Sequence, residues 1–281
     1  IRDVLTSRGL GDVYNRQTDG YNAGHGLPFD SEGMKERYPG IFFSQFTGAE
    51  LVADKWNLSR EDLDQFALES HQKAAQATES KYFDREILPV EGKNAEGIND
   101  LVMADEGIRF DASLDKLAGL NPVTEGGVIT AGNASQITDG AAAVVICNDA
   151  GLKKIQANPR AEIVSISVVG DDPVFMLTGP IPASKKALET ANLSIDDMDL
   201  YEVNEAFAPV PLAWAVDLKA DKSKLNVNGG AMALGHPLGA TGAKLMTTLL
   251  HEMERRESNY GLQAICEGGG TANATIIKRI A

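Results

Sequence analysis

Three short segments in the last third of the chain each place a chemically capable side chain beside glycines or alanines. They are residues 204–208 (NEAFA), 229–242 (GGAMALGHPLGATG) and 266–270 (CEGGG). Their reactive groups are the Asn204 amide, the His236 imidazole and the Cys266 thiol. A thiol can act as a nucleophile or as an acid and base, and a well-placed imidazole can move a proton or donate to an oxyanion. The three segments together therefore predict chemistry at a carbonyl group.

Each of these residues also has an ordinary structural interpretation. Cys266 follows the apolar run 261–265 and precedes three glycines, and a cysteine at a strand end is often only a small buried hydrophobic residue. Cys147 lies within an apolar run with no glycine turn after it, so we expect it to be structural. Asn204 directly before a helix would be a good N-cap. The residues that follow Asn204, Glu205-Ala206-Phe207, favour a catalytic role for Asn204 over a purely structural N-cap.

The setting of His236 differs from that of the other three histidines. His236 stands between Gly235 and Pro237, in a loop whose other glycines leave room around the ring. His71 and His251 fall on predicted helix surfaces and His25 on a glycine-rich turn. We therefore expect those three to be solvated and His236 to be the functional histidine.

The spacing of apolar residues predicts an α/β layered sheet in the C-terminal part of the chain. Strands alternate with helices, and the candidate residues follow strand ends, where such folds place their sites. The predicted strands are 161–169, 198–203, 225–228, 260–265 and 274–277, and the predicted helices are 183–191, 204–216 and 239–254.

The N-terminal part is less regular. The first 40 residues are rich in Gly, Asp and Asn and are predicted to be loop-like. Helical spacing covers 47–56 and 59–81, and Ser59 with acidic residues after it is typical of a helix N-terminus. Residues 82–128 mix short strands and turns, and 140–147 (GAAAVVIC) predict a buried strand.

Composition excludes several classes of function. A net charge of −14 argues against nucleic-acid binding, which needs a concentrated basic surface. No run approaches the roughly 20 apolar residues of a membrane span, and the start lacks the order of a signal peptide. Two cysteines without a CxxC partner predict neither a disulfide scaffold nor a zinc site, and favour the reducing cytoplasm. No G-x-G-x-x-G opens a dinucleotide fold and no G-x-S-x-G marks an α/β-hydrolase.

With these segments in view, the chain resembles the thiolase family over nearly its whole length. The agreement extends to residues 130–135 (TAGNAS), 139–142 (DGAA) and Gly179-Pro180. The resemblance implies a thiolase-like layered α-β-α-β-α architecture. Residues 1–138 would then be the loop domain, 139–159 the last piece of the N-terminal half, and 160–281 the C-terminal half with the catalytic loops.

The resemblance also implies roles for particular residues. Cys266 would exchange a proton with the substrate α-carbon or the leaving thiol, and His236 would activate the nucleophile. His236 and a water held by Asn204 would form one oxyanion hole, and the Gly268 N–H would contribute to a second. Ser135 and Arg109 would contact coenzyme A, and Phe207 and Met176 would line the acyl pocket. Coenzyme A would be a substrate or product, with no metal and no covalently bound cofactor.

Two features depart from the family pattern. Thiolases carry the cysteine that becomes acylated about a hundred residues upstream of the loop region, and this chain begins after that point. The chain as given should therefore lack the acyl-enzyme step. Ser44-Gln45 stands where short-chain acetoacetyl-CoA thiolases usually show His-Met, which favours a degradative 3-ketoacyl-CoA thiolase acting on longer or bulkier substrates.

Three hypotheses follow from the sequence. The leading one is a thiolase that exchanges acyl groups between acyl-CoA or acetyl-CoA and 3-ketoacyl-CoA plus CoA, assembled as a homodimer or homotetramer. The second is a truncated, non-catalytic thiolase-like protein that binds CoA or a partner. The third, a ketoacyl synthase relative, predicts a second histidine where this chain has Cys266. It ranks last.

Overall fold

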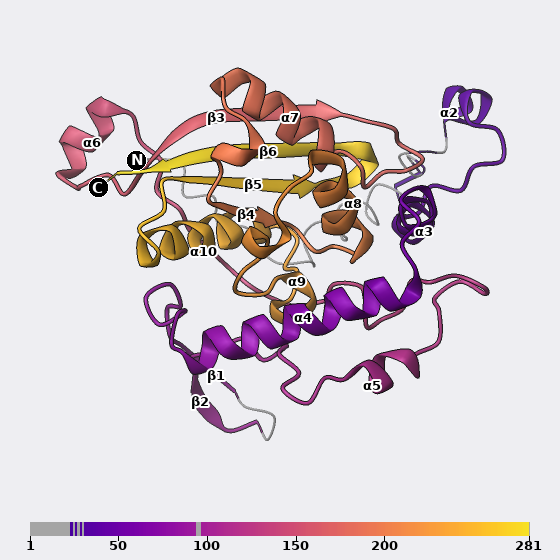
Figure 1. The fold of residues 1–281 in the computed structure, drawn as a ribbon, viewed down its shortest axis with the longest axis horizontal. Helices are drawn as coiled ribbons and strands as arrows, with labels where there is room; N and C mark the ends of the chain where they lie inside the picture. The colour runs from indigo at the N-terminus through magenta and orange to yellow at the C-terminus, as the bar shows by residue number, and fades with distance from the viewer. Residues whose placement is uncertain (1–22, 25, 27–28, 30, 94–96, 281) are drawn as a thin grey trace.

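A four-stranded mixed sheet with helices on both faces forms the centre of the fold (Figure 1). The computed structural model describes residues 23–24, 26, 29, 31–93 and 97–280, so His25 and most of the first 30 residues lie outside the described part. The strand order is β3 (Ala161–Gly170), β6 (Thr271–Arg279), β5 (Tyr260–Cys266) and β4 (Leu200–Val203). β4 and β5 are parallel, and the other pairs are antiparallel. The predicted α/β class is confirmed.

Alternation along the strands decides which helix covers which face. The hydroxyls of Ser165 and Ser167 on β3 donate to carbonyls of α7 (Pro180–Ala191) on one face. Leu200 of β4 points to the other face, where it packs with Leu249 and Met253 of α10 (Thr241–Arg255). Because successive side chains of a strand point to opposite faces, Tyr201 lies on the α7 side, against α8 (Pro209–Leu218).

The N-terminal part wraps beside this sheet and contributes mostly helices. A long helix, α4, contacts the short α9, and α3 contacts α8. The elements are α2 (Glu32–Arg37), α3 (Gln45–Lys55), α4 (Arg60–Glu79), α5 (Leu114–Ala118), α6 (Asp149–Ile155) and α9 (Ala231–Leu234), with a hairpin of β1 (Val90–Lys93) and β2 (Asn99–Val102) and short 3-10 turns η1 (Ile195–Asp197), η2 (Lys222–Lys224) and η3 (Gly268–Gly270).

Local signals explain the elements that the sequence predicted well. Ser59 and Asp62 form a capping box at the start of α4, since each side chain accepts from the other residue's backbone N–H. α3, α4, α7 and α10 lie within a few residues of the predicted helices, and β3 to β6 match four of the five predicted strands. Short strands at β1 and β2 agree with the prediction for residues 82–128.

Four predictions of local structure were wrong. Residues 140–147 form no strand, and Val145 is 78% exposed, because no other described segment pairs with them. Residues 225–228 form isolated bridges in place of a strand. Helix α8 starts only at Pro209, so residues 204–208 are not helical. The loop-like first 40 residues include the short helix α2, which Ser31 caps.

The outer face of β3 is apolar and exposed. Ile166 is 58% exposed and Val168 is 64% exposed, whereas Ser165 and Ser167, which alternate with them, are buried under α7. β3 is also an edge strand of the sheet. An exposed apolar face on an edge strand is a surface that proteins usually cover or pair. Among the described residues, no helix is long and apolar enough to span a membrane.

Candidate active site

Asn204 and His236 meet at one end of the sheet. Nδ2 of Asn204 lies 3.3 Å from Nε2 of His236, although the residues are 32 positions apart. Asn204 follows the last residue of β4, and its backbone N–H donates to the Ala264 carbonyl of β5 at 3.0 Å. Cys266 ends β5, two residues further on. The parallel pairing of β4 and β5 therefore brings the ends that carry Asn204 and Cys266 to the same edge of the sheet.

The His236 loop is held by its backbone and by its ring. The His236 N–H donates to the Gln136 carbonyl at 3.1 Å, and Nδ1 lies 2.6 Å from Oγ1 of Thr241 at the start of α10. Gly235, just before the histidine, has φ +82°, and a Cβ there would lie 2.3 Å from Oγ1 of Thr138. Both the left-handed backbone and the close approach require glycine at this position.

Burial sets the protonation state of His236. Desolvation lowers the pKa of His236 to about 4, and the positive charge of Lys244 acts in the same direction. The ring is therefore neutral near pH 7, so one nitrogen carries a lone pair that can accept a proton.

The thiol of Cys266 is also neutral, for the same physical reason. Burial raises the pKa of Cys266 to about 12, a backbone hydrogen bond opposes the shift, and the charge of Glu267 adds to it. The following turn is open: a Cβ built at Gly268 would meet no atom within 4 Å. A ligand can approach the backbone there, next to a protonated thiol. Within the described residues, no hydrogen bond joins Cys266 to His236.

A second loop lies against the Asn204 segment. The Ser135 N–H donates to the Ala206 carbonyl at 3.0 Å, and the Ala208 N–H donates to the Asn133 carbonyl at 2.9 Å. This short antiparallel pairing holds Ser135, half-buried, beside Phe207. The next residue, Gln136, joins the same loop to the His236 loop through its side chain, which donates to the Met232 carbonyl at 2.6 Å.

A buried carboxylate ties the loops together. Glu205 accepts from the Ser70 hydroxyl of α4 at 2.7 Å, from Nδ2 of Asn226 at 2.9 Å and from the Met232 N–H at 3.1 Å. A Cβ at Gly230 would lie 2.2 Å from the Glu205 carboxyl carbon, so the loop can pass this group only as glycine. The motif NEAFA signalled Glu205, but its contacts with α4 could not be seen in the sequence.

Two aromatic side chains meet where the Asn204 segment contacts α3. The rings of Phe207 and Phe46 meet edge to face with centroids 5.3 Å apart, which brings the start of α3, next to Ser44-Gln45, to the predicted pocket. Sequence reasoning missed Phe46. Met176 is buried and has φ +59°, a left-handed conformation that is uncommon for a residue with a Cβ.

Arg109 lies beside α4, two residues after Gly107, whose carbonyl accepts from the Gln136 side chain at 2.8 Å. It lines a hollow of about 230 Å³ beside α4, together with Phe110, His71 and Gln76. The prediction that His71 is solvated was wrong: it is 4% exposed, and its Nδ1 accepts from the Arg109 N–H at 3.1 Å. His251 is likewise largely buried, with its ring against the Thr247 carbonyl and Glu86. Other segments therefore cover α4 at His71 and α10 at His251, where we expected solvent-exposed helix surfaces.

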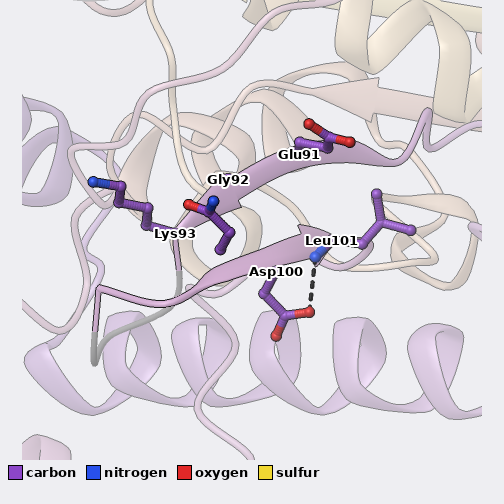
Figure 2. A pocket seen from close by; sticks show the side chains of 6 residues that line it. Glu91, Gly92, Lys93, Asp100 and Leu101 are labelled. Atoms are coloured by element: carbon purple, nitrogen blue, oxygen red, sulfur yellow. Dashed lines mark hydrogen bonds between the residues drawn. The ribbon is translucent and has the colours of Figure 1, made fainter.

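A larger hollow of about 600 Å³ lies on the β1–β2 hairpin (Figure 2). The Glu91 and Asp100 carboxylates point to opposite sides of the hairpin, and Asp100 accepts from the Leu101 N–H at 2.8 Å. None of the residues that line this hollow belongs to the segments 204–208, 229–242 and 266–270. Within the described part of the chain, no group of three or more His, Cys, Asp or Glu could hold a metal ion.

Two family models match the chain. Residues 30–150 match "Thiolase, N-terminal domain" and residues 157–279 match "Thiolase, C-terminal domain". This chain belongs to the thiolase family. Among curated thiolases, it is 53% identical over 251 residues to the steroid 3-ketoacyl-CoA thiolase FadA6 of Mycobacterium tuberculosis, covering 89% of this chain and 60% of the relative. It is 46% identical to an acetyl-CoA acetyltransferase of Paracoccus denitrificans, covering 83% of this chain and 60% of the relative.

Solved thiolase structures share the fold. The human mitochondrial 3-ketoacyl-CoA thiolase superposes with a TM-score of 0.80 at 45% identity, over 84% of this chain and 59% of that chain. A second structure of that enzyme, in complex with CoA, gives the same score and identity over 83% of this chain and 58% of that chain. The chain thus spans about 60% of the length of the thiolases that it matches.

Proposed function

We propose that this chain carries the proton-transfer centre of a thiolase, which exchanges acyl groups between acyl-CoA or acetyl-CoA and 3-ketoacyl-CoA plus CoA. The observation that carries the proposal is the pairing of Asn204 with His236 at 3.3 Å, at the same sheet edge where β5 ends in Cys266. The amide, the neutral imidazole and the thiol are the groups that acyl-group chemistry needs, and they come from three separate segments.

In this proposal, Cys266 acts as a proton donor in the cleavage direction. Breaking the carbon–carbon bond of a 3-ketoacyl-CoA leaves an enolate of acetyl-CoA, which must take a proton at its α-carbon. A thiol held protonated by burial has that proton to give. The Gly268 N–H and the pair of Asn204 and His236 would stabilise the thioester oxygens, each donor contributing roughly 3 kcal/mol to the transition state.

The rest of the substrate would lie along the loops described above. Ser135 and Arg109 would contact coenzyme A, and Phe207 with Met176 and Phe46 would line the acyl pocket. The Ser44-Gln45 pair at the start of α3 and the likeness to a steroid thiolase support a degradative enzyme for long or bulky acyl groups.

A second candidate function is CoA binding without turnover. The sequence contains two cysteines, and Cys147 is exposed on a segment that joins no sheet. The hydrogen-bond partners of His236 among the described residues include no second thiol that could accept the acyl group.

Two assays on the purified chain decide between these functions. One measures CoA-dependent cleavage of a 3-ketoacyl-CoA, and the other measures exchange of acetyl-CoA methyl protons with D₂O, which needs no acylated cysteine. Exchange that Cys266→Ser abolishes supports the proton-transfer centre, with or without cleavage. CoA binding by calorimetry with neither activity supports the second candidate. No binding and no activity would refute both.

We further propose that the protein is a cytoplasmic homodimer or homotetramer with the predicted division at residues 138 and 159. The exposed apolar face of β3 supports self-association, because a patch of Ile163, Ile166 and Val168 is costly to leave in water. Sedimentation equilibrium tests this assembly. A monomer at micromolar concentration would contradict it.

A further inference from the structure

The His236 ring is contacted at both of its nitrogens. Nδ1 lies 2.6 Å from Oγ1 of Thr241, and Nε2 lies 3.3 Å from Nδ2 of Asn204. The Thr241 hydroxyl lies in turn 2.9 Å from the carbonyl oxygen of Pro237. Thr241 is buried at the first position of α10, so solvent does not compete for its hydroxyl. These three distances form one continuous chain of polar contacts.

With Nδ2 of Asn204 facing the His236 ring, as in this structure, one arrangement of protons satisfies all three contacts. A carbonyl oxygen can only accept, and two oxygens 2.9 Å apart repel unless a proton lies between them, so the single Thr241 proton points to Pro237. Oγ1 must then accept from Nδ1, which therefore carries the ring proton of neutral His236. Nε2 is left with its lone pair, and the Asn204 amide nitrogen, which can only donate, faces it.

We propose that Thr241 is a positioning residue that fixes neutral His236 as the Nδ1–H tautomer and so leaves Nε2 as the proton acceptor of the site. In the other tautomer, the Thr241 proton would turn to Nδ1. The Thr241 hydroxyl oxygen would then face the Pro237 carbonyl oxygen at 2.9 Å with no proton between them, although that carbonyl would still accept from the Ala240 and Thr241 N–H groups. Nε2–H would also face the N–H₂ group of Asn204, donor against donor.

The same chain of contacts serves the protonated ring. When Nε2 takes a proton, Nδ1–H already donates to a hydroxyl that is itself polarised by the Pro237 carbonyl, and such chains strengthen one another in a buried site. Nε2–H can then donate to a developing oxyanion. The tautomer assignment depends only on these contacts, whereas the effect of the tautomer on turnover rests on the function proposed above.

The tautomer is measured directly by two-bond ¹H–¹⁵N correlation spectra of ¹⁵N-histidine-labelled protein. His236→Gln identifies the His236 signals among the four histidines. We expect a protonated Nδ1 and a bare Nε2 in the wild-type chain and in Thr241→Ser, which keeps the hydroxyl. In Thr241→Val, a near-isosteric change that removes the hydroxyl, we expect the Nε2–H form to gain population.

Thr247→Val is the matched control. Thr247 lies on the same helix, and its hydroxyl also donates to the carbonyl four residues earlier, at 2.8 Å, but it does not touch the His236 ring. We expect its His236 spectrum to match the wild type. An Nε2–H wild-type ring, or a Thr241→Val spectrum identical to the wild type, would overturn the proposal. If Thr241→Val does not fold, the proposal is tested by the wild-type spectrum and by Thr241→Ala, in which we also expect the Nε2–H form to gain population.

Turnover supplies the second readout. If the wild-type chain shows proton exchange or cleavage, we expect Thr241→Val to lower kcat by roughly a hundredfold with little change in KM, and Thr241→Ser to restore it. A shifted tautomer with unchanged kcat would refute the positioning role. A wild-type Nδ1–H ring in an inactive protein would refute the proposed function and leave the tautomer assignment supported.

Discussion

The protonation state of Cys266 gives a quantitative prediction about its reactivity. Thiolate is the form that alkylating reagents attack. Burial raises the pKa of Cys266 from about 9 to about 12, a difference of three pH units. At pH 8 the folded protein should therefore hold roughly a thousandfold less Cys266 thiolate than the unfolded chain, since each pH unit changes the ratio tenfold.

Iodoacetamide labelling with mass-spectrometric peptide mapping measures the difference. Exposed Cys147 serves as an internal control in the same molecule, and the chain in guanidinium gives the unfolded reference. The shape of the pH profile separates ionisation from restricted access. With the raised pKa, the Cys266 rate keeps increasing tenfold per pH unit beyond pH 10, whereas a hindered thiol of ordinary pKa levels off near pH 9.

Glu267 provides a directional check on the same reasoning. Its charge helps to raise the pKa of Cys266, so Glu267→Gln should speed labelling, whereas Glu189→Gln, at an exposed position on α7, should not. A folded-state rate within tenfold of the unfolded rate, with a plateau near pH 9, would show that burial does not hold the thiol protonated. That result would remove the physical basis for Cys266 as proton donor.

Three further predictions concern the groups around the site. Glu205→Gln should lower the free energy of unfolding in urea by about 3 kcal/mol, because its NH₂ group must face a buried donor; unchanged stability would show that the network is not needed. Gly230→Ala should cost about 2 kcal/mol or more, whereas Gly268→Ala should stay within about 0.5 kcal/mol; equal effects would contradict the contact with Glu205. Burial raises the pKa of Glu86 to about 7. The folded protein therefore binds a proton at Glu86 that the unfolded chain releases, so the contribution of Glu86 to the free energy of unfolding is largest below about pH 4.5 and is lost as the pH rises toward 7. Urea unfolding from pH 5 to 8 should show a decline of roughly 3 kcal/mol in the wild type relative to Glu86→Gln, and parallel curves would refute it.

The elements that the sequence predicted correctly carry their own local signals. Helix α4 starts at a capping box, and its apolar residues recur at helical spacing. β3 to β6 are β-branched or apolar runs that find partners within the described residues. Residues 140–147 are similarly rich in apolar residues but pair with no other segment that the structure describes, and a strand exists only as part of a sheet. Composition alone therefore could not distinguish the two cases.

Asn204 shows why the site was only partly predictable. Its N-cap interpretation assumed a helix directly after β4, but five non-helical residues come first and α8 begins at Pro209, where proline suits the first turn. Those five residues are held by partners far away in the sequence, such as Ser70 through Glu205 and Asn133 through Ala208. The three segments were recognisable from their residue types, but what holds them together came only from tertiary contacts.

Burial moves the pKa values of the two reactive groups apart. That of His236 falls to about 4 and that of Cys266 rises to about 12, so transfer of the Cys266 proton to His236 is unfavourable by roughly 11 kcal/mol, before any attraction between the resulting ions. Both groups therefore remain neutral, one with a lone pair to accept a proton and one with a proton to give. Separated pKa values of this kind mark an acid and a base. Because neither group ionises the other, the function proposed above requires the initial charge to arise on the substrate, as an enolate or a developing thioester oxyanion beside Asn204 and Gly268.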